Sequence, residues 1–266
     1  MPVLFERDRD LGLLIDRVTG LADHAEGGVV IIEAPPGVGK TQLLATAIEL
    51  AQARSVRVLT AHGVELEHEL AFGGVRQLCA PTLARLDPVA VRDVLRGPAA
   101  GAGPILGISD VPVPAGAEPL FALTAMVSNL AARGPVAIAV DDLQWLDEAS
   151  ARFLAYLARR LDGLPVLIVS ATRPLDPPLP ELATAWPPGT VFIRPEPLSA
   201  NGVGRLLETV LGTPIGDDVV TACGRVTGGN PFLVTEIGRE LAALPATGRA
   251  ERVEEIAPAA VGAAVL

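Results

Sequence analysis

The sequence predicts an α/β fold, in which a mainly parallel sheet of five strands is covered by helices and followed by a small helical lid domain. Three observations support this prediction. Short apolar runs alternate with segments of helical periodicity up to residue 197. A glycine-containing loop joins the first apolar run to a helix, and after Pro197 the pattern is entirely helical. Continuous apolar runs are typical of strands that a parallel sheet buries on both faces.

The elements of the sheet region follow one another regularly. A helix is expected before the first strand, because Leu11, Leu14, Ile15 and Val18 recur at helical spacing. The expected strands are residues 29–32, 56–60, 136–140, 165–170 and 191–194, and the expected helices are residues 41–53, 70–86, 89–95, 118–132 and 150–161. Ligands of such sheets bind beyond the carboxyl ends of the strands. The residues that bind and react with a ligand are therefore expected at that edge of the sheet.

Two regions depart from this alternation. Residues 97–117 are rich in glycine and proline, so we expect a loop or mobile insertion there. Beyond Pro197, Ser199 is expected to cap a helix to Leu211, Asp217 to cap a second, and the Gly-Gly-Asn-Pro sequence to open a third from Phe232. The predicted domains are a P-loop nucleotide-binding domain at 1–197, the helical lid at 198–245, and a tail or the start of a further domain at 246–266.

Residues 29–41 read VVIIEAPPGVGKT, which is a buried strand running into a phosphate-binding loop and then into a helix. Glycines let the backbone approach phosphate oxygens, and N–H groups at the helix start point towards them. Lys40 is predicted to reach the β- and γ-phosphates, and the Thr41 hydroxyl to bind Mg²⁺. The expected nucleotide-binding residues of the loop are Pro36, Gly37, Val38, Gly39, Lys40, Thr41 and Gln42. Ala34 replaces the usual first glycine, and a plain turn before a helix is the alternative.

The third apolar strand ends in Asp141 and Asp142, which is the Walker B pattern of nucleotide-binding proteins. A carboxylate fixed at the end of a buried strand lies where Mg²⁺ is held. We expect Asp141 to hold the metal and Asp142 to position the attacking water. The alternative is that the pair caps the following turn, where aspartate is common.

Arg173 follows the fourth strand, where a guanidinium could contact the γ-phosphate and report its presence. A surface arginine is the alternative. Pro231 is predicted to make a rigid contact from the lid to adenine, beyond its role as the first residue of a helix. The predicted catalytic residues are thus Lys40, Asp142 and Arg173, and the predicted metal ligands are Thr41 and Asp141.

Composition limits the remaining possibilities. The formal charge of −10 and the aromatic content of 3% argue against direct nucleic-acid binding by this chain. Cys79 and Cys223 are distant in the sequence, so both are expected to be buried thiols of a cytoplasmic protein. Neither a signal peptide nor an apolar run long enough to span a membrane is visible. The short apolar segment 256–266 raises the possibility that the chain is a fragment.

Taken together, ERDRDLGLL, EAPPGVGKT, VAIAVDDLQWLDEAS, VLIVSATRP and TGGNPFLVTEI resemble the ATPase module of STAND-type signalling ATPases. The resemblance is closest to the large ATP-binding LuxR-type transcriptional regulators of actinobacteria, and it covers most of the chain. It implies ATP or ADP as the nucleotide, Mg²⁺, slow hydrolysis and a nucleotide-driven switch. Glu6-Arg7 occupies the place of a short Gly-Arg element in the family, and its role is left open.

Members of that family continue through a sensor region to a C-terminal helix-turn-helix. We expect DNA binding only through such a missing segment, and further domains or self-association in a full regulator. Two other functions remain open. One is a stand-alone AAA-like ATPase that does mechanical work, and the other is a nucleotide-binding module without turnover.

Overall fold

The computed structural model describes residues 4–108, 118–174, 186–243 and 248–256 of the 266-residue chain. The chain divides into two compact units. The sheet unit comprises Leu11–Glu33 and Leu43–Ile193, and the helical unit comprises Met1–Asp10, Ala34–Gln42 and Arg194–Leu266. The phosphate-binding loop therefore groups with the two ends of the chain. The domain boundaries expected from the sequence stay a prediction.

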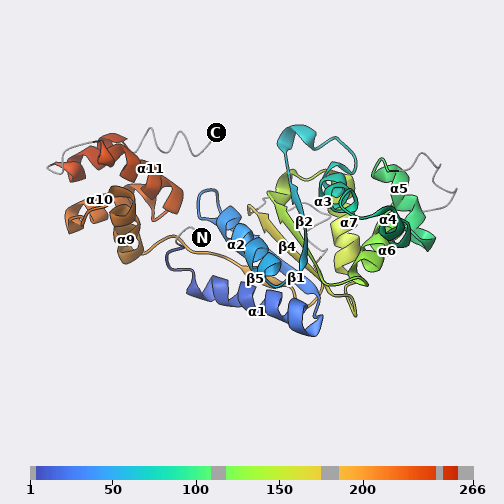
Figure 1. Ribbon diagram of the computed structural model, residues 1–266. Helices are drawn as coiled ribbons and strands as arrows, with labels where there is room; N and C mark the ends of the chain where they lie inside the picture. The colour runs from blue at the N-terminus through green and yellow to red at the C-terminus, as the bar shows by residue number, and fades with distance from the viewer. Residues whose placement is uncertain (1–3, 109–117, 175–185, 244–247, 257–266) are drawn as a thin grey trace. The chain divides into compact units, whose positions relative to one another are not determined.

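The sheet unit contains a five-stranded sheet with the strand order β2-β3-β4-β1-β5 (Figure 1). The strands are β1 (Gly28–Glu33), β2 (Arg57–His62), β3 (Val136–Asp141), β4 (Val166–Thr172) and β5 (Val191–Ile193). Every pairing between neighbouring strands is parallel. The predicted α/β fold is confirmed, and all five expected strands are present. Parallel pairing brings the carboxyl ends of the strands to one edge of the sheet.

Helices cover both faces of this sheet. They are α1 (Asp8–His24), α2 (Lys40–Ala53), α3 (Gly73–Leu83), α4 (Pro88–Val94), α6 (Pro119–Ala131) and α7 (Glu148–Ala158). Because side chains alternate along a strand, Val29 and Ile31 enter the core formed with α3, α6 and α7. Val30 and Ile32 are equally buried and point to the opposite face, where Figure 1 shows α1 and α2.

The expectation of a loop over residues 97–117 is wrong for its first part. Residues Gly97–Gly101 form a 3-10 helix (η2), and Ala102–Ile105 form the short helix α5. Pro98 lies in the first turn of η2, where its missing N–H costs no hydrogen bond. Ala99 and Ala102 are fully buried, because small side chains allow close packing against α6. The remainder of the expected loop, residues 109–117, lies outside the described residues.

The helical unit contains α9 (Ala200–Leu211), α10 (Asp217–Thr227) and α11 (Pro231–Ala242). These helices pack around an apolar cluster that includes Leu207, Cys223 and Ile237. Ser199 caps α9 as expected, because its hydroxyl accepts from the N–H of Gly202. The expected cap of α10 is corrected: Gly216 occupies the cap position, and Asp217 belongs to the first helical turn. A carboxylate there still favours the helix through its dipole.

Both cysteines are buried and unpaired with each other, as predicted. Burial raises the pKa of the Cys79 thiol to about 12 and that of Cys223 to about 11. Of the helices that the structure describes, none combines the length and the apolar character needed to cross a membrane.

Candidate functional site

The phosphate-binding loop has the backbone that its sequence predicts. Gly37 has a φ of 80° and Gly39 a φ of 104°, a region that residues with a side chain rarely adopt. At Gly37 an added Cβ would also lie only 2.5 Å from the Asn230 side chain. Ala34 does not have a positive φ, so the loop needs no glycine there. The replacement of the usual first glycine therefore leaves the loop geometry intact.

Lys40 begins the 14-residue helix α2 directly after the loop. The residue is 7% exposed, and its Nζ donates to the carbonyl of Pro35 at 3.0 Å. Thr41, the next residue, is exposed. Backbone N–H groups at a helix start have no intrahelical acceptor and attract anions. Lys40 is also the only lysine in the chain, whose other strong cations are all arginines.

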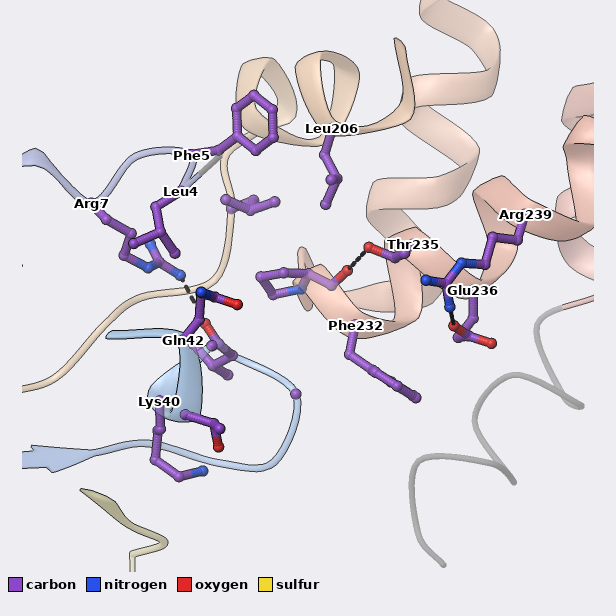
Figure 2. Close-up of a pocket in the computed structure, with 16 residues that line it drawn as sticks. Leu4, Phe5, Arg7, Lys40, Gln42, Leu206, Phe232, Thr235, Glu236 and Arg239 are labelled. Carbon is purple, nitrogen blue, oxygen red and sulfur yellow. Dashed lines mark hydrogen bonds and ion pairs between the residues drawn. The ribbon is translucent and has the colours of Figure 1, made fainter. Parts of the chain in front are cut away.

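A pocket of about 490 Å³ opens beside this loop within the helical unit (Figure 2). Its volume lies in the usual range for small-molecule sites. One part of its lining is the loop and the start of α2, and the other part comes from the N-terminal segment and α11. The predicted residues that line it are Gly37, Val38, Gly39, Lys40, Thr41, Gln42 and Pro231. Apolar side chains such as Leu4, Phe5 and Leu206 complete it.

The start of α11 holds the loop backbone directly. The Asn230 Nδ2 donates to the carbonyl of Pro36 at 2.9 Å, and the backbone N–H of Phe232 donates to the carbonyl of Gly37 at 3.1 Å. The Asn230 Oδ1 meanwhile caps α11 by accepting from the N–H of Phe232 at 3.0 Å. The sequence indicated Pro231 and not Asn230. An asparagine before a helix is explained by capping alone, so its hydrogen bond to the loop left no separate signal in the sequence.

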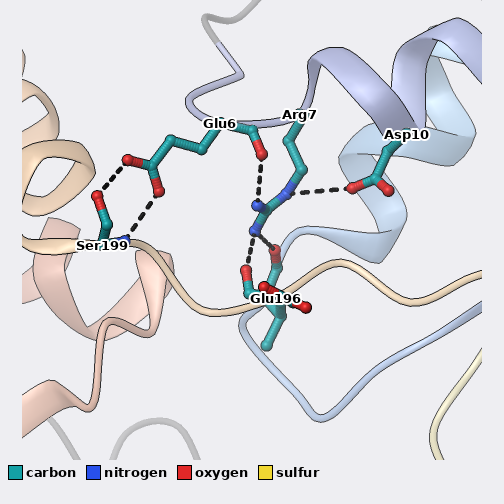
Figure 3. A network of polar contacts seen from close by, with 6 residues as sticks. Glu6, Arg7, Asp10, Glu196 and Ser199 are labelled. Carbon is teal, nitrogen blue, oxygen red and sulfur yellow. Dashed lines mark hydrogen bonds and ion pairs between the residues drawn. The ribbon is translucent and has the colours of Figure 1, made fainter.

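Arg7 is a second contact to the loop (Figure 3). It is 4% exposed, and its guanidinium donates to the carbonyls of Val38 at 3.2 Å and Glu196 at 2.7 Å. The carbonyl of Glu6 accepts a further bond at 3.0 Å. The carboxylate of Asp10 lies 3.9 Å away. Arg7 therefore joins the N-terminal segment, the loop and the segment that leads into α9.

Glu6, whose role the sequence left open, bonds to Ser199 before α9. It has a φ of 56°, a backbone region that favours glycine. Its carboxylate accepts from the N–H of Ser199 at 2.8 Å and from the Ser199 hydroxyl. These hydrogen bonds lower the pKa of Glu6. Glu6 thus fastens the N-terminal segment to the start of α9.

The remaining predicted residues meet at the carboxyl edge of the sheet unit. Asp141 ends β3, and Arg173 follows Thr172 at the end of the neighbouring strand β4. Asp142 has a φ of 45°, and its N–H donates to the Oδ1 of Asp141 at 3.0 Å. The Gln144 side chain contacts both strand ends: it donates to Asp142 and accepts from the N–H of Arg173.

His62 also belongs to this edge. It ends β2 and pairs in register with Asp141. Its Nδ1 lies 3.9 Å from the Asp141 Oδ2, and one ligand atom from each of His62, Asp141 and Asp142 lies within 4.8 Å of the others. Imidazole and carboxylate groups are ordinary metal ligands. Only strand register, which spacing along the chain does not give, brings these residues together.

The predicted site residues thus form two groups. The loop residues and Pro231 belong to the helical unit, whereas Asp141, Asp142 and Arg173 belong to the sheet unit. A glycine loop between β1 and α2, carboxylates at the end of β3 and this strand order together define a P-loop NTPase fold.

Comparison with known proteins identifies the family. Residues 3–169 match the AAA ATPase domain, so the chain belongs to the AAA ATPase domain family. An uncharacterized protein of Rhizobium meliloti (strain 1021) is 27% identical over 191 residues. That match covers 64% of this chain and only 18% of the relative. Nucleotide binding is the activity that this family and fold imply.

Many solved structures share the fold, including the following three. The Aeropyrum pernix ORC1 protein, solved in complex with DNA, has a TM-score of 0.56 at 20% identity over 98% of this chain and 66% of its own. Cdc6p of Pyrobaculum aerophilum has a TM-score of 0.59 at 17% identity, over 91% of this chain and 62% of its own. A STAND protein of Pyrococcus horikoshii with a tetratricopeptide repeat sensor has a TM-score of 0.56 at 16% identity, over 96% of this chain and 33% of its own.

Proposed function

We propose that this chain is the ATP-binding regulatory switch of a larger LuxR-type transcriptional regulator, and that Mg²⁺-dependent conversion of ATP to ADP sets its conformational state. In this proposal the loop amides and Lys40 bind the phosphates, and the apolar part of the pocket beside Pro231 takes the adenine. The glycine backbone and the mixed polar and apolar lining fit such a ligand. Thr41 and Asp141 would hold Mg²⁺, which neutralises charge on the phosphates when bound.

Asp142 is the residue proposed to orient the attacking water. The water oxygen forms a bond to the γ-phosphorus, the bond from that phosphorus to the β–γ bridging oxygen breaks, and the water proton leaves with the products ADP and phosphate. Arg173 is proposed to contact the γ-phosphate, so that it distinguishes ATP from ADP. Such a difference between the two ligands is what a switch requires, because a ligand can shift an equilibrium only through differential affinity.

The observation that carries this proposal is the set of hydrogen bonds that the phosphate-binding loop accepts from the N-terminal segment and from the start of α11. Three consecutive loop carbonyls, those of Pro36, Gly37 and Val38, accept hydrogen bonds from Asn230, Phe232 and Arg7. A nucleotide that reshapes this loop must therefore alter contacts made by α11 and the N-terminal segment. That physical link between a ligand site and a separate helical element supports a switch.

Two alternative functions predict different behaviour of the purified protein. A mechanical ATPase needs self-association, so its turnover per molecule would rise steeply with protein concentration. A binding module without turnover would retain ADP and release no phosphate. We expect the switch to carry ADP on purification and to release phosphate slowly, at a rate per molecule that does not depend on protein concentration.

The single lysine makes a direct test possible. We expect an amine-reactive reagent to modify the side chain of Lys40, and Mg²⁺-ATP and ADP to protect it, as measured by mass spectrometry of the digested protein. Lys40→Ala is the negative control for labelling, because it contains no lysine. It should keep the fold while losing the nucleotide-dependent rise in melting temperature. At 100 times the dissociation constant that stabilisation is about 2.7 kcal/mol in the wild type. An unchanged labelling rate with saturating nucleotide would reject the assignment.

A further inference from the structure

The side chain of Gln144 connects two strand ends of the sheet unit. It lies in the 3-10 helix η3 (Leu143–Trp145) and is 5% exposed. Its Nε2 donates to the Oδ1 of Asp142 at 2.7 Å. Its Oε1 accepts from the backbone N–H of Arg173 at 3.1 Å and lies 3.2 Å from the Thr172 hydroxyl. One buried amide therefore contacts the carboxylate after β3 and the backbone after β4.

The chemistry of these partners requires an amide at this position. The N–H of Arg173 can only donate, so the atom that faces it must be the carbonyl oxygen of Gln144. The NH₂ group then faces the Asp142 carboxylate, which can only accept when ionised. A glutamate would keep the acceptor but would place a second carboxylate against Asp142. A methionine would have a similar length and neither hydrogen bond.

Asp142 needs such a partner because its own backbone does not fix its carboxylate. It lies in the left-handed region, with a φ of 45° and a ψ of 50°, which is strained for a residue other than glycine. Its carbonyl is already used by the N–H of Trp145 at 2.8 Å, and its N–H by the carboxylate of Asp141. The bond from Gln144 is charge-assisted, and such bonds are shorter and stronger than neutral ones.

We infer that Gln144 is a positioning residue that aims the Asp142 carboxylate and couples its direction to the backbone at Arg173. A shift of the end of β4, caused by Arg173 meeting a γ-phosphate, passes through the Gln144 amide to the group that orients water. The inference rests on the proposed function, in which Asp142 positions that water and Arg173 detects the phosphate. In this proposal Gln144 acts only through the Asp142 carboxylate and the backbone at Arg173.

The test compares Gln144→Met and Gln144→Glu in the full chain. We expect each to lower kcat for Mg²⁺-ATP by about tenfold, and to leave KM and the dissociation constant of a fluorescent ADP analogue within about twofold, because only an orienting contact is lost. The matched control is Gln77→Met. The Gln77 amide oxygen also accepts a backbone N–H at this edge, from His62 at 2.9 Å, and we expect that variant to keep the wild-type kcat.

A double-mutant comparison separates positioning from a merely structural role. In the Asp142→Asn background, Gln144→Met should slow turnover by less than about twofold, because the carboxylate it acts through is gone. The same tenfold loss in both backgrounds would overturn the inference. If Asp142→Asn alone kept the wild-type kcat, the proposed role of Asp142 would fail. If Asp142→Asn were slow and Gln144→Met normal, only the role of Gln144 would fail.

Amide hydrogen exchange supplies a readout that does not depend on turnover. In the wild type, a non-hydrolysable ATP analogue and ADP should give different protection at residues 141–145 and at residues 172–173. In Gln144→Met the difference should persist at 172–173 and disappear at 141–145. An undiminished difference at 141–145 in that variant, or no difference in the wild type, would reject the coupling.

Discussion

Asn230 has two separable tasks, and two substitutions separate them. Asn230→Ala removes both the cap of α11 and the bond to the carbonyl of Pro36. Loss of an N-cap side chain costs about 1 kcal/mol. The hydrogen bond from Asn230 to the Pro36 carbonyl is exposed, so its net contribution to the free energy of unfolding is near the lower end of the usual range, about 0.5 kcal/mol. We therefore expect Asn230→Ala to lower the free energy of unfolding by about 1.5 kcal/mol.

Asn230→Asp keeps a good cap, because a carboxylate oxygen can accept from the N–H groups that Asn230 now serves. It replaces the Nδ2 donor to Pro36 with an oxygen that can only accept, so the expected loss is at least about 0.5 kcal/mol. It also places a negative charge beside the phosphate-binding loop and should weaken ATP and ADP binding. Asp87→Ala, which removes the cap of α4 in the sheet unit, should leave nucleotide affinity unchanged.

Urea denaturation followed by circular dichroism measures the stability changes, and titration with a fluorescent nucleotide measures the affinities. The critical result is that Asn230→Ala should destabilise the protein more than Asn230→Asp does. Equal destabilisation by the Ala and Asp variants would show that the cap contributes nothing. An Asn230→Ala protein within about 0.3 kcal/mol of the wild type would refute both contributions, because the smallest expected sum is larger.

Three further results are expected. Arg173→Ala should retain ADP binding but lose the difference between ATP and ADP in exchange or proteolysis experiments; equal loss of both nucleotides would instead make Arg173 structural. The Glu6 pKa is lowered by the bonds from Ser199, so the stability it contributes is present above the ordinary value of 4.5 and is lost as pH falls through the lower folded value. Glu6→Gln should reduce that acid dependence between about pH 5 and pH 3, and identical urea midpoints for both proteins across that range would contradict it. Cys79, with a pKa of about 12, should react with a thiol reagent only after unfolding; rapid labelling of the native protein would contradict its burial.

The sequence alone was sufficient for the fold class and for the succession of the five strands and most of the helices along the chain. Apolar periodicity and the signals for turns and caps act over a few residues, so they are visible along the chain. The same is true of the phosphate-binding loop, because its glycines, Lys40 and Thr41 are consecutive. The helical character of residues 97–105 escaped prediction, since close packing of Ala99 and Ala102 outweighs the local preference of glycine and proline.

The tertiary structure decided which residues complete the candidate sites. Asn230 and Pro36 are 194 residues apart in the chain, and Arg7 reaches Val38 across 31 residues. His62 meets Asp141 only through the register of β2 and β3, and Gln144 meets Arg173 only because β3 and β4 are neighbours. Local sequence pattern carries no information about such pairs, because their contact energies arise only once distant segments have packed.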